Sequence, residues 1–306
     1  MVARVVYSQT LNFLDAGAEC GNFARTMKQY LFVFSLVALV FSACNTNNVT
    51  QDDSLKKYFD DAGVQGTFAI FDNAQGQFTV YNLKRYRDSA YLPASTFKIF
   101  NSLAALGTGV VFSDTVVVPW DKVVRMGPGG DTMKQWNKDM DMREAFAVSN
   151  VGFYQEMARR IGKDTMQKLL DSVGYGLRYD TFRIKGNMDR FWLDNTLKIT
   201  PDEQLGFVKR LYFKQLPFQN REQEIVKSLM VRESNDKYIL AYKTGWGTTE
   251  KGNQLGWVVG WVEENKHVYP FVLNIESPDA KMDMVGARMK ILKGILTQMG
   301  FFEGHK

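Results

Sequence analysis

The chain has 306 residues, of which 45% are hydrophobic and 23% charged, and its 38 lysines and arginines outnumber 33 aspartates and glutamates for a net charge of +5. This composition excludes a disordered chain and predicts a globular protein with a sizeable core. Basic residues are interspersed with acidic ones along the chain and form no basic patch, so no nucleic-acid partner is expected.

The N-terminal part has the pattern of an export signal. Met27 and Lys28 precede a largely apolar run at residues 31–41, which ends at Ser42-Ala43-Cys44. A basic start, a short apolar segment and small residues before a break are typical of a secretory signal peptide, so we expect one at residues 27–43. An uncleaved membrane anchor is the alternative. Residues 1–26 fit neither a signal nor a domain, and we expect translation to begin at Met27.

Cys44 follows Ser-Ala as in a bacterial lipobox, although Phe41 replaces the more usual leucine. The resemblance predicts a lipid anchor at Cys44, which would be the only membrane contact, and a location on the periplasmic side of a bacterial envelope. The polar residues 44–58 are expected to be a tether.

Strand-like stretches occur at both ends of the remaining chain. Residues 67–72 and 77–82 flank a turn and predict a β-hairpin, while the C-terminal part contains three strand-like runs at 238–244, 255–262 and 268–275, then an amphipathic helix at 282–299. Short helical patterns lie between, including 142–162 and a helix opened by Thr200-Pro201. We therefore predict an α/β fold of the α+β type: a central antiparallel sheet built from both chain ends and flanked by helices, with an inserted all-helical region at about 114–215.

A serine and a lysine share one predicted helix. Ser95 lies three residues before Lys98, in a stretch that begins at Pro93 and continues with apolar residues at helical spacing. Positions i and i+3 are neighbours on a helix, so both side chains can face one spot. A lysine on an apolar helix is costly to bury as a cation, so it must either become neutral or find a partner. Lys98 can thus act as a base for Ser95.

The residue inventory excludes other common catalytic sets. The two histidines, His267 and His305, and the two cysteines, Cys20 and Cys44, supply no zinc-type ligand cluster, so no metal is expected. For the same reason a Ser-His-Asp triad is poorly supported, and a nucleophilic serine would need a lysine as its base.

Two further motifs supply polar groups. Ser149-Asn150-Val151 lies at a break between helical runs and offers a second hydroxyl. Lys243-Thr244-Gly245 ends a predicted strand before Trp246, and presents a cation and a hydroxyl to a substrate carboxylate; Gly245 would let a ligand approach the backbone. The order S-x-x-K, S-x-V, K-T-G is a strong combined signal for penicillin-recognising serine enzymes.

With these motifs, the chain from about residue 59 onward resembles the class D, oxacillinase-type serine β-lactamases. The matches are Pro93 to Lys98, Ser149-Asn150-Val151, Phe191-Trp192-Leu193-Asp194, Lys243-Thr244-Gly245 and the run 256–263. Two positions depart from the family pattern: Asp194 stands where glutamate is usual, and Leu177 replaces the asparagine of Y-G-N.

The resemblance implies the serine β-lactamase/penicillin-binding transpeptidase-like fold, a β-lactam substrate, no bound cofactor, and a specific mechanism. Lys98 would react with carbon dioxide to give a carbamate, which serves as general base while Ser95 attacks the lactam and again in deacylation. Ser149, with Lys243 nearby, would protonate the departing nitrogen, and the backbone N–H groups of Ser95 and Trp246 would form the oxyanion hole. The remaining implied roles are substrate binding by Lys243, Thr244, Gly245, Trp246 and Arg288, and a carbamate pocket of Phe97, Val151 and Leu193, with Trp192 donating its indole N–H.

Two other functions share this set of motifs. A penicillin-binding D,D-peptidase or a β-lactam sensor would form the same acyl-enzyme without efficient turnover. The sequence favours the β-lactamase, because Val151 and Trp192 fit a shielded carbamate. It gives no oligomeric state.

Overall fold

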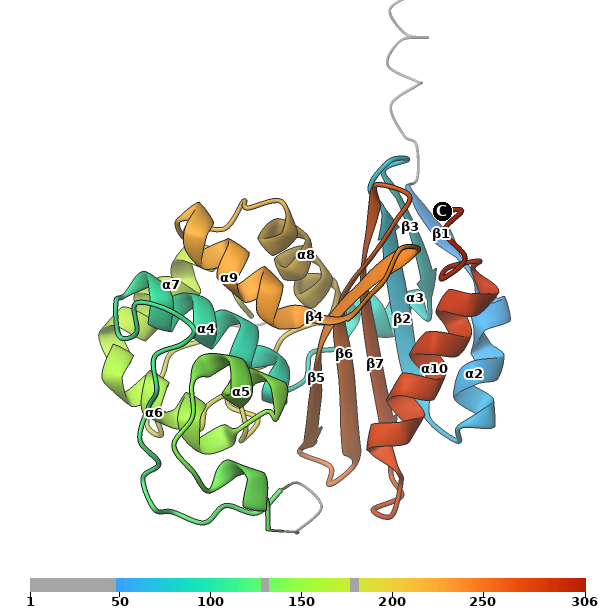
Figure 1. Cartoon of the computed structure of the whole chain (residues 1–306). Helices are drawn as coiled ribbons and strands as arrows, with labels where there is room; N and C mark the ends of the chain where they lie inside the picture. The colour runs from blue at the N-terminus through green and yellow to red at the C-terminus, as the bar shows by residue number, and fades with distance from the viewer. Residues whose placement is uncertain (1–47, 128–131, 177–181) are drawn as a thin grey trace, which may run out of the picture. The chain divides into compact units, whose positions relative to one another are not determined.

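A seven-stranded sheet organises the described residues, 48–127, 132–176 and 182–306, in the computed structural model (Figure 1). The strand order is β1-β3-β2-β7-β6-β5-β4, and all neighbouring pairs except β1 and β3 are antiparallel. The strands are β1 (Val49–Gln51), β2 (Gln65–Asp72), β3 (Gln77–Tyr81), β4 (Val231–Ser234), β5 (Tyr238–Thr248), β6 (Gln254–Glu264) and β7 (His267–Ser277). Because β2 pairs with β7, the prediction of a sheet built from both chain ends is confirmed.

Helices cover both faces of this sheet. In Figure 1, α2 and α10 lie together on one face, and the larger group from α4 to α9 lies on the other. The α-helices are α2 (Lys56–Asp61), α3 (Leu83–Asp88), α4 (Lys98–Gly107), α5 (Met142–Ala147), α6 (Val151–Ile161), α7 (Lys163–Val173), α8 (Pro201–Tyr212), α9 (Asn220–Met230) and α10 (Met284–Gln298), and the 3₁₀ helices are η1 (Asp53–Leu55), η2 (Ala94–Phe97) and η3 (Lys134–Trp136).

The sheet separates two hydrophobic cores, and the alternation of side chains along β6 shows how. Trp257 and Trp261 belong to the core under the helical region, whereas Val258 and Val262 belong to the core under α10. Successive side chains of a strand point to opposite faces, so a strand that is buried on both faces reads as one continuous apolar run.

The inserted helical region differs from the expected one in two ways. It extends beyond residue 215, because α9 reaches Met230. It is also not all helical: within the described residues 108–127 and 132–141, the regular structure consists of η3 and isolated bridges such as Val118 to Met140. Consecutive β-branched residues at 116–118, followed by Pro119, favour extended backbone over helix.

The predicted tether at 44–58 is wrong for residues 49–58, which belong to the folded unit Asn48–Lys306. β1 pairs in parallel with β3, and Leu55 is fully buried in the core under α10. The free edge of β3 satisfies the backbone of an otherwise polar segment, a contact that composition alone does not reveal. Residues 1–47, with the predicted signal peptide and Cys44, lie outside the described residues. No helix in the described part has the length and hydrophobicity to cross a membrane.

Candidate active site

Ser95 is the second residue of η2, a short 3₁₀ turn that leads directly into α4. The expected α-helix therefore begins at Lys98, and Ser95 stands on the 3₁₀ turn in front of it. Ala94 has a φ of +49°, a left-handed conformation that is uncommon for a residue with a side chain. Lys98 Nζ donates a hydrogen bond to Ser95 Oγ at 2.7 Å, so the predicted pairing of the two side chains is confirmed.

Lys98 is fully buried. Its Nζ lies 5.6 Å from the centroid of the Tyr154 ring, and among the described residues no carboxylate forms an ion pair with it. Burial lowers the pKa of Lys98 to about 7, because the low-dielectric surroundings destabilise the ammonium form. A large fraction of the Lys98 side chains is therefore neutral near pH 7, and a neutral amine can accept a proton from Ser95.

A second pair of the same type faces the first. Lys243 Nζ donates a hydrogen bond to Ser149 Oγ and a second one to the Thr244 carbonyl oxygen at 3.0 Å. Burial, and then the positive charges of Lys98, Arg232 and Arg288, hold the pKa of Lys243 well below its usual range. Ser149 itself has a left-handed φ of +58° at the break between α5 and α6, which is the kind of strained conformation that clusters at functional sites.

The exposed edge of β5 lies beside the Ser95 turn. β4 pairs only with Ile239 to Ala241 of β5, so among described residues no strand adjoins the rest of that edge, and this part contacts η2 instead. At Gly245 a Cβ would lie 3.1 Å from the Pro93 carbonyl oxygen and 3.2 Å from Thr96 Cγ2. The glycine thus lets β5 pack closely on η2. The expectation that it also lets a ligand approach the backbone stays a prediction.

These elements enclose a cavity of about 790 Å³. Seven of the twelve predicted site residues line it: Ser95, Ser149, Val151, Leu193, Thr244, Trp246 and Arg288. The other five, Phe97, Lys98, Trp192, Lys243 and Gly245, are buried behind its wall. The structure therefore brings all twelve together at one site, although they come from five separate stretches of the chain.

Trp192 is fully buried, and its ring stacks on Phe97 with the ring centroids 5.0 Å apart. The Trp192 backbone carbonyl accepts a hydrogen bond from Ala94 N, which fixes the tryptophan loop to the Ser95 turn. The indole Nε1 is buried and has no hydrogen-bond partner among the described residues. A buried N–H without an acceptor is costly, so this position is suited to a further acceptor group.

Arg288 reaches the cavity from α10. It is 8% exposed, and its guanidinium donates to the Gly245 carbonyl oxygen at 2.7 Å. Burial lowers the pKa of Arg288 to about 10, which leaves it cationic at neutral pH. An arginine held this way beside Thr244 presents a charged donor and a hydroxyl to an anion in the cavity.

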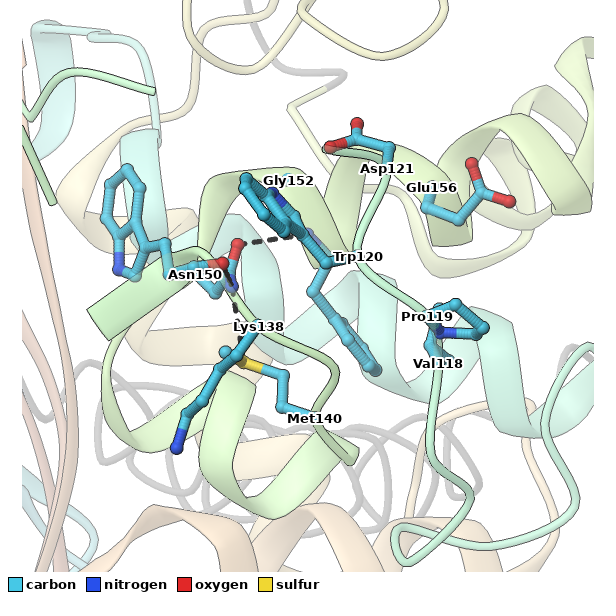
Figure 2. Close-up of a pocket in the computed structure, with 11 residues that line it drawn as sticks. Val118, Pro119, Trp120, Asp121, Lys138, Met140, Asn150, Gly152 and Glu156 are labelled. Atoms are coloured by element: carbon cyan, nitrogen blue, oxygen red, sulfur yellow. Dashed lines mark hydrogen bonds between the residues drawn. The ribbon is translucent and has the colours of Figure 1, made fainter. Parts of the chain in front are cut away.

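Behind Ser149, Asn150 anchors the neighbouring loop. It is 3% exposed, its side-chain oxygen caps α6 by accepting from Phe153 N, and its amide donates to the Trp136 carbonyl oxygen at 3.1 Å. Figure 2 shows these contacts around a second, much smaller cavity, which is lined by Asn150, Gly152 and Met140. Trp136 lines both cavities, so Asn150 holds a shared wall in place.

Comparisons with known proteins agree with this site. A model of the penicillin binding protein transpeptidase domain matches residues 47–297. The β-lactamase OXA-48 of Klebsiella pneumoniae is 36% identical over 266 residues, covering 87% of this chain and 95% of the relative. Among solved structures, the class D β-lactamase YbXI from Nostoc is 39% identical with a TM-score of 0.73. The match covers 80% of this chain and 98% of the YbXI chain.

The chain belongs to the class D β-lactamases. A related solved structure is the C-terminal domain of the Bacillus licheniformis BlaR penicillin-receptor, with a TM-score of 0.74, 28% identity, and coverage of 83% of this chain and 97% of that domain. The family assignment and the transpeptidase-like fold inferred from the motifs are confirmed.

Sequence reasoning missed several residues of this class D site. Arg125, Trp136, Val148 and Arg190 line the cavity but lie outside the recognised motifs. Arg190 directly precedes Phe191-Trp192, and that proximity was the one available signal. Leu177, the departure from the family pattern, lies outside the described residues. Within the described chain, no group of three or more His, Cys, Asp or Glu side chains is placed to hold a metal ion.

Proposed function

We propose that this class D β-lactamase hydrolyses the β-lactam amide of penicillins and related antibiotics through an acyl-enzyme on Ser95. The observation that carries the proposal is the hydrogen bond between Ser95 Oγ and a fully buried Lys98 whose pKa is about 7. A general base is most effective when its pKa lies near the working pH.

The neighbouring groups support the later steps. Ser149 Oγ, which is hydrogen bonded to Lys243, would pass a proton to the lactam nitrogen as the C–N bond breaks. The pKa of Lys243 is lowered by burial and surrounding cations, so it can exchange this proton readily. Thr244 and Arg288 line the same cavity and would bind the substrate carboxylate. The backbone N–H groups of Ser95 and Trp246 would stabilise the oxyanion, a contribution of ~3 kcal/mol per donor.

The residues around Lys98 fit a carbamate on its Nζ, formed when the neutral amine adds carbon dioxide and releases a proton. Among the described residues, Trp192 Nε1 is a buried donor without an acceptor, and Lys98 has no carboxylate partner. Phe97 stacks on Trp192, and Val151 and Leu193 line the cavity above, so these apolar side chains would shield the group from water. When present, the carbamate supplies an anionic general base at this position.

The test is turnover of a chromogenic cephalosporin by the purified protein. We expect repeated turnover by the native chain and none by Ser95→Ala. A stable one-to-one acyl adduct without turnover would instead favour a penicillin-binding peptidase or a receptor domain, an alternative that the likeness to the BlaR domain keeps open.

The carbamate has its own test. With ¹³C-labelled bicarbonate, we expect a carbamate carbon signal in the native protein that is absent in Lys98→Ala. Trp192→Phe keeps the aromatic stack but removes the N–H donor, so this variant should require more bicarbonate for half-maximal activity. Equal bicarbonate dependence in the native protein and Trp192→Phe would contradict the role of the indole.

We further propose that Cys44 carries the lipid anchor and holds the enzyme on the periplasmic side of a bacterial envelope. The support is the signal-like pattern of residues 27–43. Mass spectrometry of the N-terminal peptide from membranes should find an acylated Cys44, and a soluble protein that retains residues 27–43 would contradict this.

A further inference from the structure

The cavity beside Ser95 has an unbalanced charge. Three arginines, Arg125, Arg190 and Arg288, line it, and the described lining contains no aspartate or glutamate. Lys98 and Lys243 lie buried behind the same wall. A cleft lined by charges of one sign concentrates ligands of the opposite sign.

Two of these arginines, Arg125 and Arg288, have defined partners. Arg125 forms an ion pair with Asp121 through both terminal nitrogens, at 2.9 and 2.5 Å, and its Nε donates to Gln155 at 2.9 Å. The same contact lowers the pKa of Asp121 to about 2, so the pair stays ionised throughout the neutral range. Arg288 is held on the Gly245 carbonyl oxygen beside Thr244, where one substrate carboxylate would bind.

Arg190 differs from both. Its side chain is exposed to the cavity, and among the described residues no carboxylate or other acceptor pairs with it. The two described acids nearest to it in the sequence are engaged elsewhere: Asp189 pairs with Arg159 at 2.5 Å, and Asp194 accepts hydrogen bonds from Thr196.

The backbone that carries Arg190 is firmly placed. Arg190 N donates to the Asn187 carbonyl oxygen at 3.0 Å, and Leu193 N donates to the Arg190 carbonyl oxygen at 2.7 Å. The next two residues, Phe191 and Trp192, are buried. The guanidinium therefore projects from a fixed turn of the helical region, while Arg288 enters from α10, which packs on the sheet.

We infer that Arg190 is a second anion-binding residue, which favours β-lactams whose acyl side chain carries its own carboxylate or sulfonate. The inference rests on the proposed hydrolysis. A cavity of about 790 Å³ lies in the upper part of the range for sites that bind drug-sized ligands, so it has room for the acyl side chain beside the bicyclic nucleus. Arg288 and Thr244 take the carboxylate of the nucleus, and Arg190 takes the second anion by a forked, charge-assisted contact.

The experiment compares two penicillins that differ by one group. Both have the same nucleus and a phenylacetyl side chain. One of them carries an added carboxylate on the side-chain carbon between the phenyl ring and the amide carbonyl. The readout is the ratio of kcat/KM for the dianionic over the monoanionic substrate, measured at low and high salt. We expect Arg190→Gln to lower this ratio about three- to tenfold, mainly through KM, as removal of a partly solvated ion pair does. Arg190→Lys should retain part of the ratio, and high salt should reduce the native ratio.

Arg183→Gln is the matched control. Arg183 lies in the same loop, is half-exposed and pairs with Asp171, but it does not line the cavity. This variant should leave the ratio unchanged. If Arg190→Gln also leaves the ratio unchanged, or lowers kcat/KM for both substrates equally, the inference is wrong. If the native protein hydrolyses neither penicillin, the proposed function itself fails, and the two failures are thereby distinguished.

Discussion

The buried Lys98 should lower the free energy of unfolding, and Lys98→Met should therefore stabilise the protein. In the unfolded chain the lysine has its ordinary pKa of 10.5, whereas burial lowers it to about 7 in the folded state. Between these values the unfolded state binds more protons, so the folded state loses stability as pH falls from 10.5 toward 7. Methionine has a similar shape and carries no charge, so the variant avoids this cost.

The size of the effect follows from the two pKa values. At ~1.4 kcal/mol per pKa unit, Lys98 should cost ~4 kcal/mol at pH 7 and ~2 kcal/mol at pH 9. Loss of the Lys98–Ser95 hydrogen bond in the variant offsets ~1 kcal/mol of the gain at both pH values. The advantage of Lys98→Met should thus be ~3 kcal/mol at pH 7 and should shrink by ~2 kcal/mol at pH 9.

Urea unfolding of both proteins in bicarbonate-depleted buffer at the two pH values provides the assay. The difference in unfolding free energy between the two proteins cancels the pH dependence that comes from all groups that titrate alike in both. Added bicarbonate should stabilise the native protein at pH 7 but not Lys98→Met, because only the native amine can bind carbon dioxide. A difference in unfolding free energy that does not change between pH 7 and pH 9 would refute a pKa near 7 for buried Lys98.

Two further predictions concern the scaffold. Gly260→Ala places a Cβ 2.0 Å from the Ala241 carbonyl oxygen and should cost more than ~3 kcal/mol of unfolding free energy. At Gly186 an added Cβ would have no atom within 4 Å among the described residues other than its chain neighbours, so Gly186→Ala should lie within ~1 kcal/mol of the native protein in urea unfolding. Asn150→Ala removes the cap of α6 and the contact to Trp136, so it should lower the free energy of unfolding by ~2–3 kcal/mol. Asn150→Asp keeps the oxygen that accepts the capping hydrogen bond and should lose less. An equal loss of stability in both variants, measured by thermal unfolding, would contradict the capping role.

The sequence predicted the features that depend on near neighbours in the chain. The hairpin of β2 and β3 follows from alternating strand composition around a turn, and α8 follows from the Thr200-Pro201 start, where the capping box is present. The pairing of Ser95 with Lys98 also needed only a spacing of three residues. Such features form by local geometry, so composition and spacing suffice to predict them.

Several outcomes depended on residues far apart in the chain. The segment before residue 59 reads as a polar tether, but β3 supplies a strand edge and the core under α10 accepts Leu55. Residues 108–141 lie between helices, yet the described part of this segment contains only η3 and isolated bridges as regular structure. No local pattern reveals where a distant strand edge or an apolar surface is available.

The site shows the same division. Sequence motifs named Ser149, Lys243 and Trp192, and the family resemblance assigned their roles. Only the tertiary structure shows that Lys243 Nζ contacts Ser149 across 94 positions of sequence, and that Trp192 Nε1 is buried without an acceptor in the described part of the chain. Only the tertiary structure also distinguishes Arg190, without a described partner, from Arg125, which pairs with Asp121. The sequence determines which reactive groups exist, whereas their burial and mutual distances, which set pKa and charge balance, arise when distant segments pack together.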